Sequence, residues 1–128
     1  MKFYCGTDII EVERVKKSIL STPRFKERIF SPLEIDYAES KSDVTKYQHY
    51  AGRFAAKEAI YKSLSNVTSN LQLSQIEIIN DPQNNRPTVV LHNDLLHEMM
   101  KCENLTVDVS ISHIKDYACA NAIAVFNK

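Results

Sequence analysis

Two strictly alternating runs near the C-terminus constrain the fold of this chain more than any other feature. Residues 105–113 (LTVDVSISH) and 117–126 (YACANAIAVF) place apolar side chains at every second position, as strands with one buried face do. Only residues 114–116 separate them, and so short a connection predicts a β-hairpin. The second run also aligns Ala118, Ala120, Ala122 and Ala124 on one face. This flat surface favours a helix packed on the sheet inside the chain, with close contact to another subunit as the alternative.

The remaining sequence alternates between strand and helix patterns. Residues 3–12 are apolar on both alternating faces, which predicts a strand buried on both sides. Short helices follow, with a break at residues 21–23, and Ser31-Pro32-Leu33-Glu34 has the pattern of a capping box that begins another helix. A long helix is expected from about residue 44 to 66, capped by Asp43.

The segment between the long helix and the final hairpin contains two more short strands. Residues 74–80 and 87–92 have a β pattern, and Asn85 in their connection is expected in the left-handed conformation. Asn93 and Asp94 then predict the start of another helix. Strands and helices are mixed without a repeating βαβ order. We therefore predict an α+β fold, with a mainly antiparallel sheet packed with one long and several short helices.

Composition bounds the class of protein. With 128 residues, 44% of them hydrophobic, the chain can bury one modest core, so residues 1–128 are expected to form a single domain. No apolar run approaches 18 residues, which indicates no membrane span, and no export signal is evident. Cys5, Cys102 and Cys119 are odd in number and widely spaced, which suggests neither a disulfide framework nor a zinc site. A cytoplasmic location is expected.

The charge is balanced over the chain but not along it. Sixteen basic and sixteen acidic residues cancel, which argues against a protein that mainly grips nucleic acid. Between residues 13 and 28, however, six basic residues face two acidic ones, a net charge of +4. This segment is either a solvated helix face or a surface for an acidic partner.

Two carboxylates stand where apolar side chains are expected. On a helical wheel Glu58 falls within about 60° of the apolar residues Tyr47 and Phe54, inside their stripe. Asp8 lies within the strand that is predicted to be buried on both faces. Each has a structural alternative: Glu58 could pair with Lys62 one turn later on the helix surface, and Asp8 could be a satisfied buried group.

Two misplaced carboxylates from separate elements suggest a shared partner. Mg²⁺ takes oxygen ligands, commonly from one or two carboxylates, and completes its shell with water and substrate phosphates. Gly6 would let a ligand or another backbone approach closely beside Asp8. His113 at the end of the first C-terminal run is a weaker candidate, since a lone histidine there is more often structural.

Three segments together resemble a known family. GTDIIEVER (6–14), GRFAAKEAIYKSL (52–64) and VSISHIKDYACA (109–120) are similar in order and separation to the motifs of the holo-(acyl-carrier-protein) synthases, the small bacterial phosphopantetheinyl transferases. The resemblance covers essentially the whole chain and implies a phosphopantetheinyl transferase-like fold. It also implies a reaction: a serine hydroxyl of apo-acyl carrier protein attacks the pyrophosphate of coenzyme A, takes phosphopantetheine and releases adenosine bisphosphate, for fatty acid biosynthesis.

The resemblance assigns roles to residues. Asp8 and Glu58 would hold Mg²⁺ against the pyrophosphate, and Lys62 would contact the same phosphates or assist the leaving group. Arg53 and His113 would grip the nucleotide phosphates. The group that accepts the serine proton is open, with Asp8 as our choice.

The resemblance also implies partners. Arg14, Arg24 and Arg28 match positions where the family docks the acidic acyl carrier protein, and the family is typically a homotrimer with active sites between subunits. Two rival functions remain: a Mg²⁺-dependent phosphohydrolase that uses the same carboxylates, and a non-catalytic module that binds an acidic protein through residues 13–28.

Overall fold

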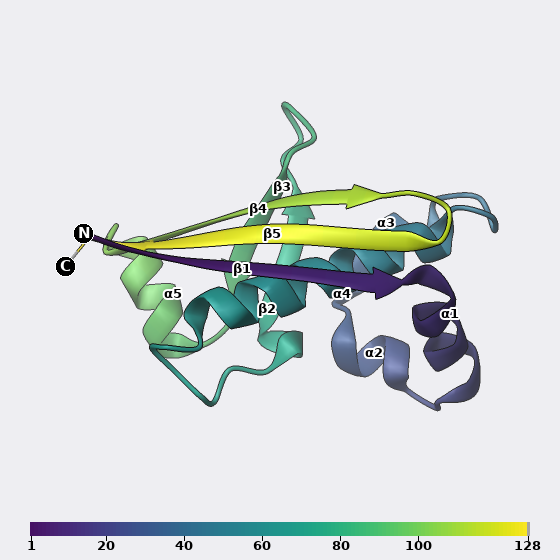
Figure 1. Cartoon of the computed structure of the whole chain (residues 1–128), viewed down its shortest axis with the longest axis horizontal. Coiled ribbons are helices and arrows are strands. Elements are labelled where there is room, and N and C mark those ends of the chain that lie inside the picture. The colour runs from purple at the N-terminus through teal and green to yellow at the C-terminus, as the bar shows by residue number, and fades with distance from the viewer. Residues whose placement is uncertain (128) are drawn as a thin grey trace.

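A three-stranded antiparallel sheet with one long helix on its face organises the structure, a computed structural model that describes residues 1–127 (Figure 1). The strands are β1 (Lys2–Glu11), β4 (Leu105–His113) and β5 (Tyr117–Phe126), in the order β1-β5-β4. Helix α4 (Lys46–Leu64) contacts all three strands. The strand pattern therefore predicted the C-terminal hairpin correctly. The first strand, β1, also pairs with the last strand, β5, along its whole length.

The alanine face of β5 packs against α4. All four alanines are at most 5% exposed. Each of them lies in a buried cluster that also contains at least one alanine of α4. Small side chains on both surfaces let the helix axis lie close to the sheet. The prediction of internal helix-on-sheet packing is confirmed, and the alternative use of this face as a subunit contact is wrong.

Gly6 marks the closest approach of β1 to α4. A Cβ atom at this position would lie 1.8 Å from the carbonyl oxygen of Ala59 and 3.0 Å from the backbone nitrogen of Ser63. Its backbone has no positive φ, so glycine is required for space and not for conformation. The expected close approach at Gly6 is therefore made by the backbone of the helix that carries Glu58.

The other face of the three-stranded sheet is open. Phe3 and Ile9 are 59% and 69% exposed, while Gly6 and Ala122 on the helix side are buried. The prediction of a strand buried on both sides is thus wrong for β1 in this chain. Apolar residues on both faces of a strand show that both faces avoid water, but they do not show that the chain itself covers them.

A second sheet, one short helix and a 3₁₀ turn pack on the far side of α4. Strands β2 (Ile76–Asn80) and β3 (Pro87–Leu91) form a hairpin whose tip projects beyond β4 in Figure 1, with Asn85 left-handed at φ 59° as expected. Helix α3 (Pro32–Glu39) starts with the predicted capping box of Ser31 and Glu34. A 3₁₀ turn, η1 (Leu73–Gln75), replaces the first residues of the predicted strand 74–80.

A fully buried ion pair ties these elements to α4. The Lys57 Nζ lies 2.9 Å from Oε1 of Glu34, and both side chains are 0% exposed. Lys57 also donates to the carbonyls of Leu73 and Ile76, and Glu34 accepts the backbone N–H of Ile78 at 2.8 Å. Every polar atom of the pair therefore has partners, which a buried pair needs if it is not to be strongly destabilising.

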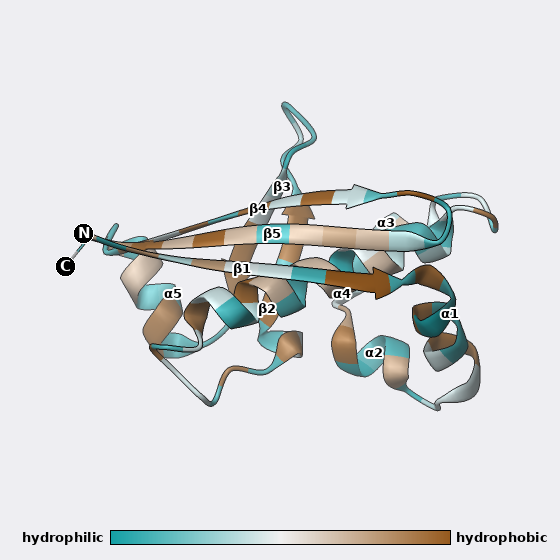
Figure 2. Cartoon of the chain, viewed as in Figure 1, coloured by the Kyte–Doolittle hydropathy of each residue, from teal (hydrophilic) through white to brown (hydrophobic). Residues whose placement is uncertain are grey.

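The remaining helices flank the two ends of the sheet. Helices α1 (Val12–Ser21) and α2 (Phe25–Ile29) follow directly from β1, and Figure 2 shows that both mix hydrophilic and hydrophobic residues around their surfaces. Helix α5 (Asp94–Lys101) lies near the chain ends and is capped by Asn93, as predicted. The cap predicted at Asp43 is wrong: Thr45 precedes α4, without a side-chain cap, because the segment before it forms a turn held by Ser42.

Among residues 1–127, no helix combines the length and the apolar character that a membrane span requires.

Candidate active site

A cavity of about 420 Å³ lies where β1 and α4 meet α1 and α2. Asp8 reaches it from the middle of β1, and Glu58 reaches it from α4. Arg14, Ser18 and several apolar side chains line the rest of it, with Phe25 and Phe54 stacked at a centroid distance of 6.3 Å. The two carboxylates singled out in the sequence therefore face one cavity. Two side chains that bind the same ligand must be arranged in this way.

Lys62 contacts Asp8 and not Glu58. Its Nζ donates to the backbone carbonyl of Thr7 at 2.8 Å and lies 3.3 Å from Oδ1 of Asp8. The ion pair joins α4 to β1 across the rim of the cavity. The alternative reading of Glu58 and Lys62 as a pair on the helix surface is therefore not what the structure shows.

Glu58 has an environment that disfavours its charge. No hydrogen bond or ion pair to its carboxylate occurs among the described residues, and the side chain is partly buried. Burial raises its pKa above the ordinary value, the charge of Asp8 raises it further, and Lys62 opposes both. A cation between the two carboxylates would remove this penalty.

The donor set suits a hard cation that carries other ligands with it. Within residues 1–127 no cluster of three or more His, Cys, Asp or Glu side chains could hold a metal. Two carboxylates alone match Mg²⁺, which keeps several waters and shares substrate phosphates, and do not match a metal that needs four protein ligands. Asp8 already binds a cation in this structure, the ammonium of Lys62.

The three arginines predicted to bind a partner lie beside this cavity or near it. Arg14 lines the cavity from α1, and Arg24 and Arg28 come from the start and the end of α2. All three side chains are exposed. Arg24 has a left-handed backbone at φ 65°, which is uncommon for any residue other than glycine, and it forms the tight turn between the two helices.

Arg53 and His113 lie elsewhere. Arg53 is 5% exposed, packs 4.2 Å from the ring centre of Tyr37 and donates to the side chain of Asn80. Its Nε has no hydrogen-bond partner among the described residues. Five residues of helix separate it from Glu58, a rotation of about 140°, so the two side chains leave α4 on different sides.

His113 is exposed at the end of β4. Its Nδ1 lies 3.0 Å from Oε1 of Gln48, and its ring is 5.0 Å from that of His49. Burial, followed by the charge of His113, lowers the pKa of His49 to about 4. His113, His49 and Arg53 therefore form a second group of nitrogen-containing side chains, and none of them lines the cavity with Asp8.

Sequence reasoning missed two parts of this region. Lys57 is completely buried, whereas the helical wheel placed only Glu58 inside the apolar stripe. The wheel failed because α4 is covered by the sheet on one side and by α3 and β2 on the other, so Glu58 lies at the half-buried edge. The wall formed by Phe25 and Phe54 was also missed, because the two residues belong to different helices and the sequence does not show that their rings stack.

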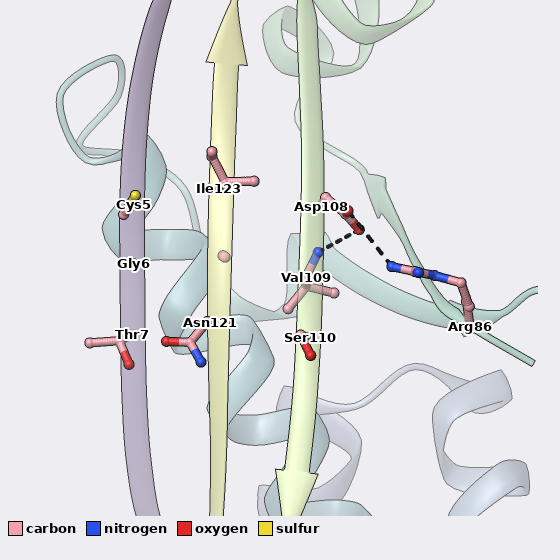
Figure 3. A pocket seen from close by; sticks show the side chains of 10 residues that line it. Cys5, Gly6, Thr7, Arg86, Asp108, Val109, Ser110, Asn121 and Ile123 are labelled. Carbon is pink, nitrogen blue, oxygen red and sulfur yellow. Dashed lines mark hydrogen bonds and ion pairs between the residues drawn. The ribbon is translucent and has the colours of Figure 1, made fainter.

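A larger cavity of about 550 Å³ lies on the open face of the sheet. It is lined from all three strands and by Arg86 of the projecting hairpin, whose Nη2 lies 3.8 Å from Oδ2 of Asp108 (Figure 3). Figure 3 shows Thr7 and Asn121 on neighbouring strands along this face. None of the predicted site residues lines it.

Comparison with known proteins supports the assignment suggested by the three motifs. The profile of the 4'-phosphopantetheinyl transferase superfamily matches residues 4–122. The chain belongs to this superfamily. A protein of Thermoanaerobacter sp. (strain X514) named holo-[acyl-carrier-protein] synthase is 40% identical over 125 residues, which cover 98% of this chain and 88% of that protein.

Solved structures agree with the family. A holo-(acyl-carrier-protein) synthase from Bacillus anthracis in complex with CoA (3',5'-ADP) is 30% identical, covers 94% of both chains and has a TM-score of 0.75. The fold of a Chronobacterium ammoniagenes ACPS-CoA complex matches with a TM-score of 0.83 over 100% of both chains, at 24% identity. The predicted α+β fold and the predicted phosphopantetheinyl transferase family are confirmed.

Proposed function

We propose that this phosphopantetheinyl transferase moves the phosphopantetheine group of coenzyme A to a serine hydroxyl of apo-acyl carrier protein and releases adenosine bisphosphate. The product would be the holo-carrier for fatty acid biosynthesis. The observation that carries the proposal is the convergence of Asp8 and Glu58 on one cavity in a chain of this family. CoA in the related Bacillus anthracis structure supports the choice of donor.

The two carboxylates would hold Mg²⁺ together with water and the pyrophosphate of coenzyme A. Bound there, the ion would neutralise charge that grows on the oxygens of the transferring phosphoryl group. The partly buried carboxylate of Glu58 supports this assignment, because burial and then the charge of Asp8 raise its pKa, and a bound cation would oppose both effects.

The protein side chains would orient the substrates and handle the proton. Lys62 is near enough to the cavity rim to contact the same phosphates or the leaving group. Asp8, directly or through a water, is our candidate for the group that accepts the serine proton. The apolar wall of Phe25 and Phe54 would limit the access of water to the reacting centre.

The exposed arginines on α1 and α2 would dock the acidic carrier. Arg14 lines the cavity, and Arg24 and Arg28 lie at the two ends of α2, whose Phe25 lines it too, so a carrier bound there would present its serine to the carboxylates. Charge complementarity of this kind mainly accelerates encounter and fixes orientation. Arg14→Ala should therefore raise the KM for the carrier much more than the KM for coenzyme A.

The separate position of Arg53 and His113 favours an active site shared between subunits. Both are assigned to the nucleotide phosphates, yet within one chain Arg53 contacts Tyr37 and Asn80, His113 contacts Gln48, and neither lines the cavity. A neighbouring copy that packs beside the cavity could bring its exposed His113 to it, so we propose a homotrimer. Sedimentation of a fully active monomer at micromolar concentration would contradict this.

The cysteines bear on the compartment. Cys5, Cys102 and Cys119 are all free, which supports a reducing environment, the cytoplasm.

Mass spectrometry of an apo-carrier after incubation with the chain, coenzyme A and Mg²⁺ tests the function. The carrier should gain the mass of phosphopantetheine. Asp8→Asn and Glu58→Gln should each lower the rate by at least about 100-fold, whereas Glu98→Gln on exposed α5 should leave it unchanged. Release of adenosine bisphosphate at full rate without a carrier would indicate a phosphohydrolase instead. Unchanged activity of Asp8→Asn would reject the metal assignment.

A further inference from the structure

We infer that Lys62 is an exchangeable counter-ion: it neutralises Asp8 until a divalent cation displaces it, and it then becomes available to a substrate phosphate. The inference rests on the proposed function, because it takes Asp8 and Glu58 as the metal ligands. Lys62 would thus have a second role, and the binding of the metal would be coupled to the binding of the nucleotide.

Only one of the two contacts of the Lys62 ammonium uses an atom that a bound metal would need. The bond to the carbonyl oxygen of Thr7, at 2.8 Å, uses an atom that is no metal ligand in the proposal. The contact with Oδ1 of Asp8, at 3.3 Å, uses the carboxylate that the metal needs. The ammonium can therefore leave Asp8 and still stay at the rim of the cavity through Thr7.

Exposure indicates that the contact with Asp8 is easily broken. The Lys62 side chain is 53% exposed, while that of Asp8 is 18% exposed and held by the middle of a strand paired along its length. Ion pairs with one well-solvated partner contribute little to stability. The carboxylate is thus fixed and the ammonium is free to move.

The charges at the cavity explain why exchange is required. Besides the exposed Arg14, the cation near the two carboxylates is the Lys62 ammonium, and it contacts only Asp8. A Mg²⁺ ion bound to Asp8, with a Mg–O distance of about 2.1 Å, would lie within roughly 5 Å of that ammonium if it stayed in place. Like charges so close repel each other, so Lys62 opposes metal binding until an anion gives its ammonium another partner.

A defined thermodynamic signature follows from the exchange. Without nucleotide the metal must displace Lys62 and binds weakly. With the pyrophosphate of coenzyme A present, the displaced ammonium gains an anionic partner, so each ligand strengthens the binding of the other by the same factor. Loss of the ammonium should tighten binding of the metal alone and reduce this mutual enhancement.

Binding of Mn²⁺ to the full-length chain, measured by electron paramagnetic resonance of the free ion, tests the exchange without any turnover. In the absence of nucleotide, Lys62→Met should bind Mn²⁺ about two- to tenfold more tightly than the parent chain. Arg14→Met is the matched control, because Arg14 lines the same cavity but makes no ion pair with Asp8 among the described residues. It should change the affinity less than about twofold. Added coenzyme A should then tighten Mn²⁺ binding more in the parent chain than in Lys62→Met.

The outcomes separate this inference from the proposed metal site. If Asp8→Asn abolishes Mn²⁺ binding but Lys62→Met binds no more tightly than the parent chain, the metal site stands and the exchange is wrong. An equal gain in Arg14→Met would show a general charge effect and would also overturn the exchange. Mn²⁺ binding that does not depend on Asp8 would overturn both the site and the exchange.

Discussion

Replacement of Gly6 by alanine tests whether the contact between β1 and α4 positions the active site. The new Cβ would lie 1.8 Å from the carbonyl oxygen of Ala59, and real contacts of this kind do not fall below 3.0 Å. The strand and the helix must therefore separate by more than about 1 Å at this point. The atoms that the new Cβ would meet belong to the backbone of α4 and not to a flexible side chain, so the backbone itself has to move.

The expected losses follow from that displacement. Overpacking in a core typically costs about 1–3 kcal/mol, and a clash between two backbone segments belongs at or above the upper end of this range. Asp8 lies two residues after Gly6, and Glu58 precedes Ala59, so the same movement separates the two carboxylates. A misplacement of about 1 Å can cost about 100-fold in rate. We expect Gly6→Ala to lose about 3 kcal/mol of unfolding free energy and about 100-fold in carrier modification.

Urea unfolding and mass spectrometry of the carrier measure the two effects. Gly52→Ala on α4 is the matched control, because its Cβ would meet only Cγ2 of the Ile111 side chain, at 3.0 Å. That methyl group can shift, and alanine is favoured over glycine inside a helix by about 1 kcal/mol. Gly52→Ala should therefore stay within about 1 kcal/mol of the parent chain and keep its activity. A Gly6→Ala protein as stable and as active as the parent would refute the positioning argument.

Four further substitutions probe the charges of the site and its surroundings. The pKa of Glu58 is raised in the folded chain, so the free energy of unfolding should fall as pH rises from about 4.5 through the raised value. In urea unfolding in metal-free buffer, Glu58→Gln should therefore be more stable than the parent chain at pH 7 and should have no advantage below pH 4. The pKa of His49 is lowered to about 4, so stability should be lost as pH falls from about 6.5 towards 4; His49→Gln should flatten this slope, and an unchanged slope would contradict the burial argument. Arg28→Glu should raise the KM for the carrier and weaken its salt dependence, and a change in kcat alone would count against docking. Arg24→Gly should relieve the left-handed backbone and gain about 0.5–1 kcal/mol of unfolding free energy while the KM for the carrier rises.

Local patterns in the sequence predicted the parts of the fold that depend on near neighbours. The alternation in the C-terminal runs, the capping box at Ser31 and the left-handed turn at Asn85 are properties of a few consecutive residues. Asp8 and Glu58 could be found because each interrupts an apolar pattern in its own element. Their convergence, in contrast, was only a hypothesis until the pairing of β1 and the packing of α4 were known.

Long-range contacts account for what the sequence did not predict. Nothing near Lys57 shows that it is paired with Glu34, since the partner lies in another helix and the backbone acceptors come from η1 and β2. The same holds for Lys62, whose nearest charged residue on the helix is Glu58 but whose partner in space is Asp8. A periodicity argument treats each helix alone and cannot choose between such partners.

The buried pair of Glu34 and Lys57 has a consequence for how this chain can change over evolutionary time. Loss of one member leaves a buried charge without a partner, which typically costs about 3–5 kcal/mol, whereas joint replacement by well-packed apolar residues can be nearly neutral. Intermediate sequences with a single change would therefore be counter-selected, although both end points are viable. Glu34 and Lys57 should covary among relatives as one inherited unit. The helix that carries Glu58 would then keep its attachment to α3 and β2 even where the surrounding surface diverges freely.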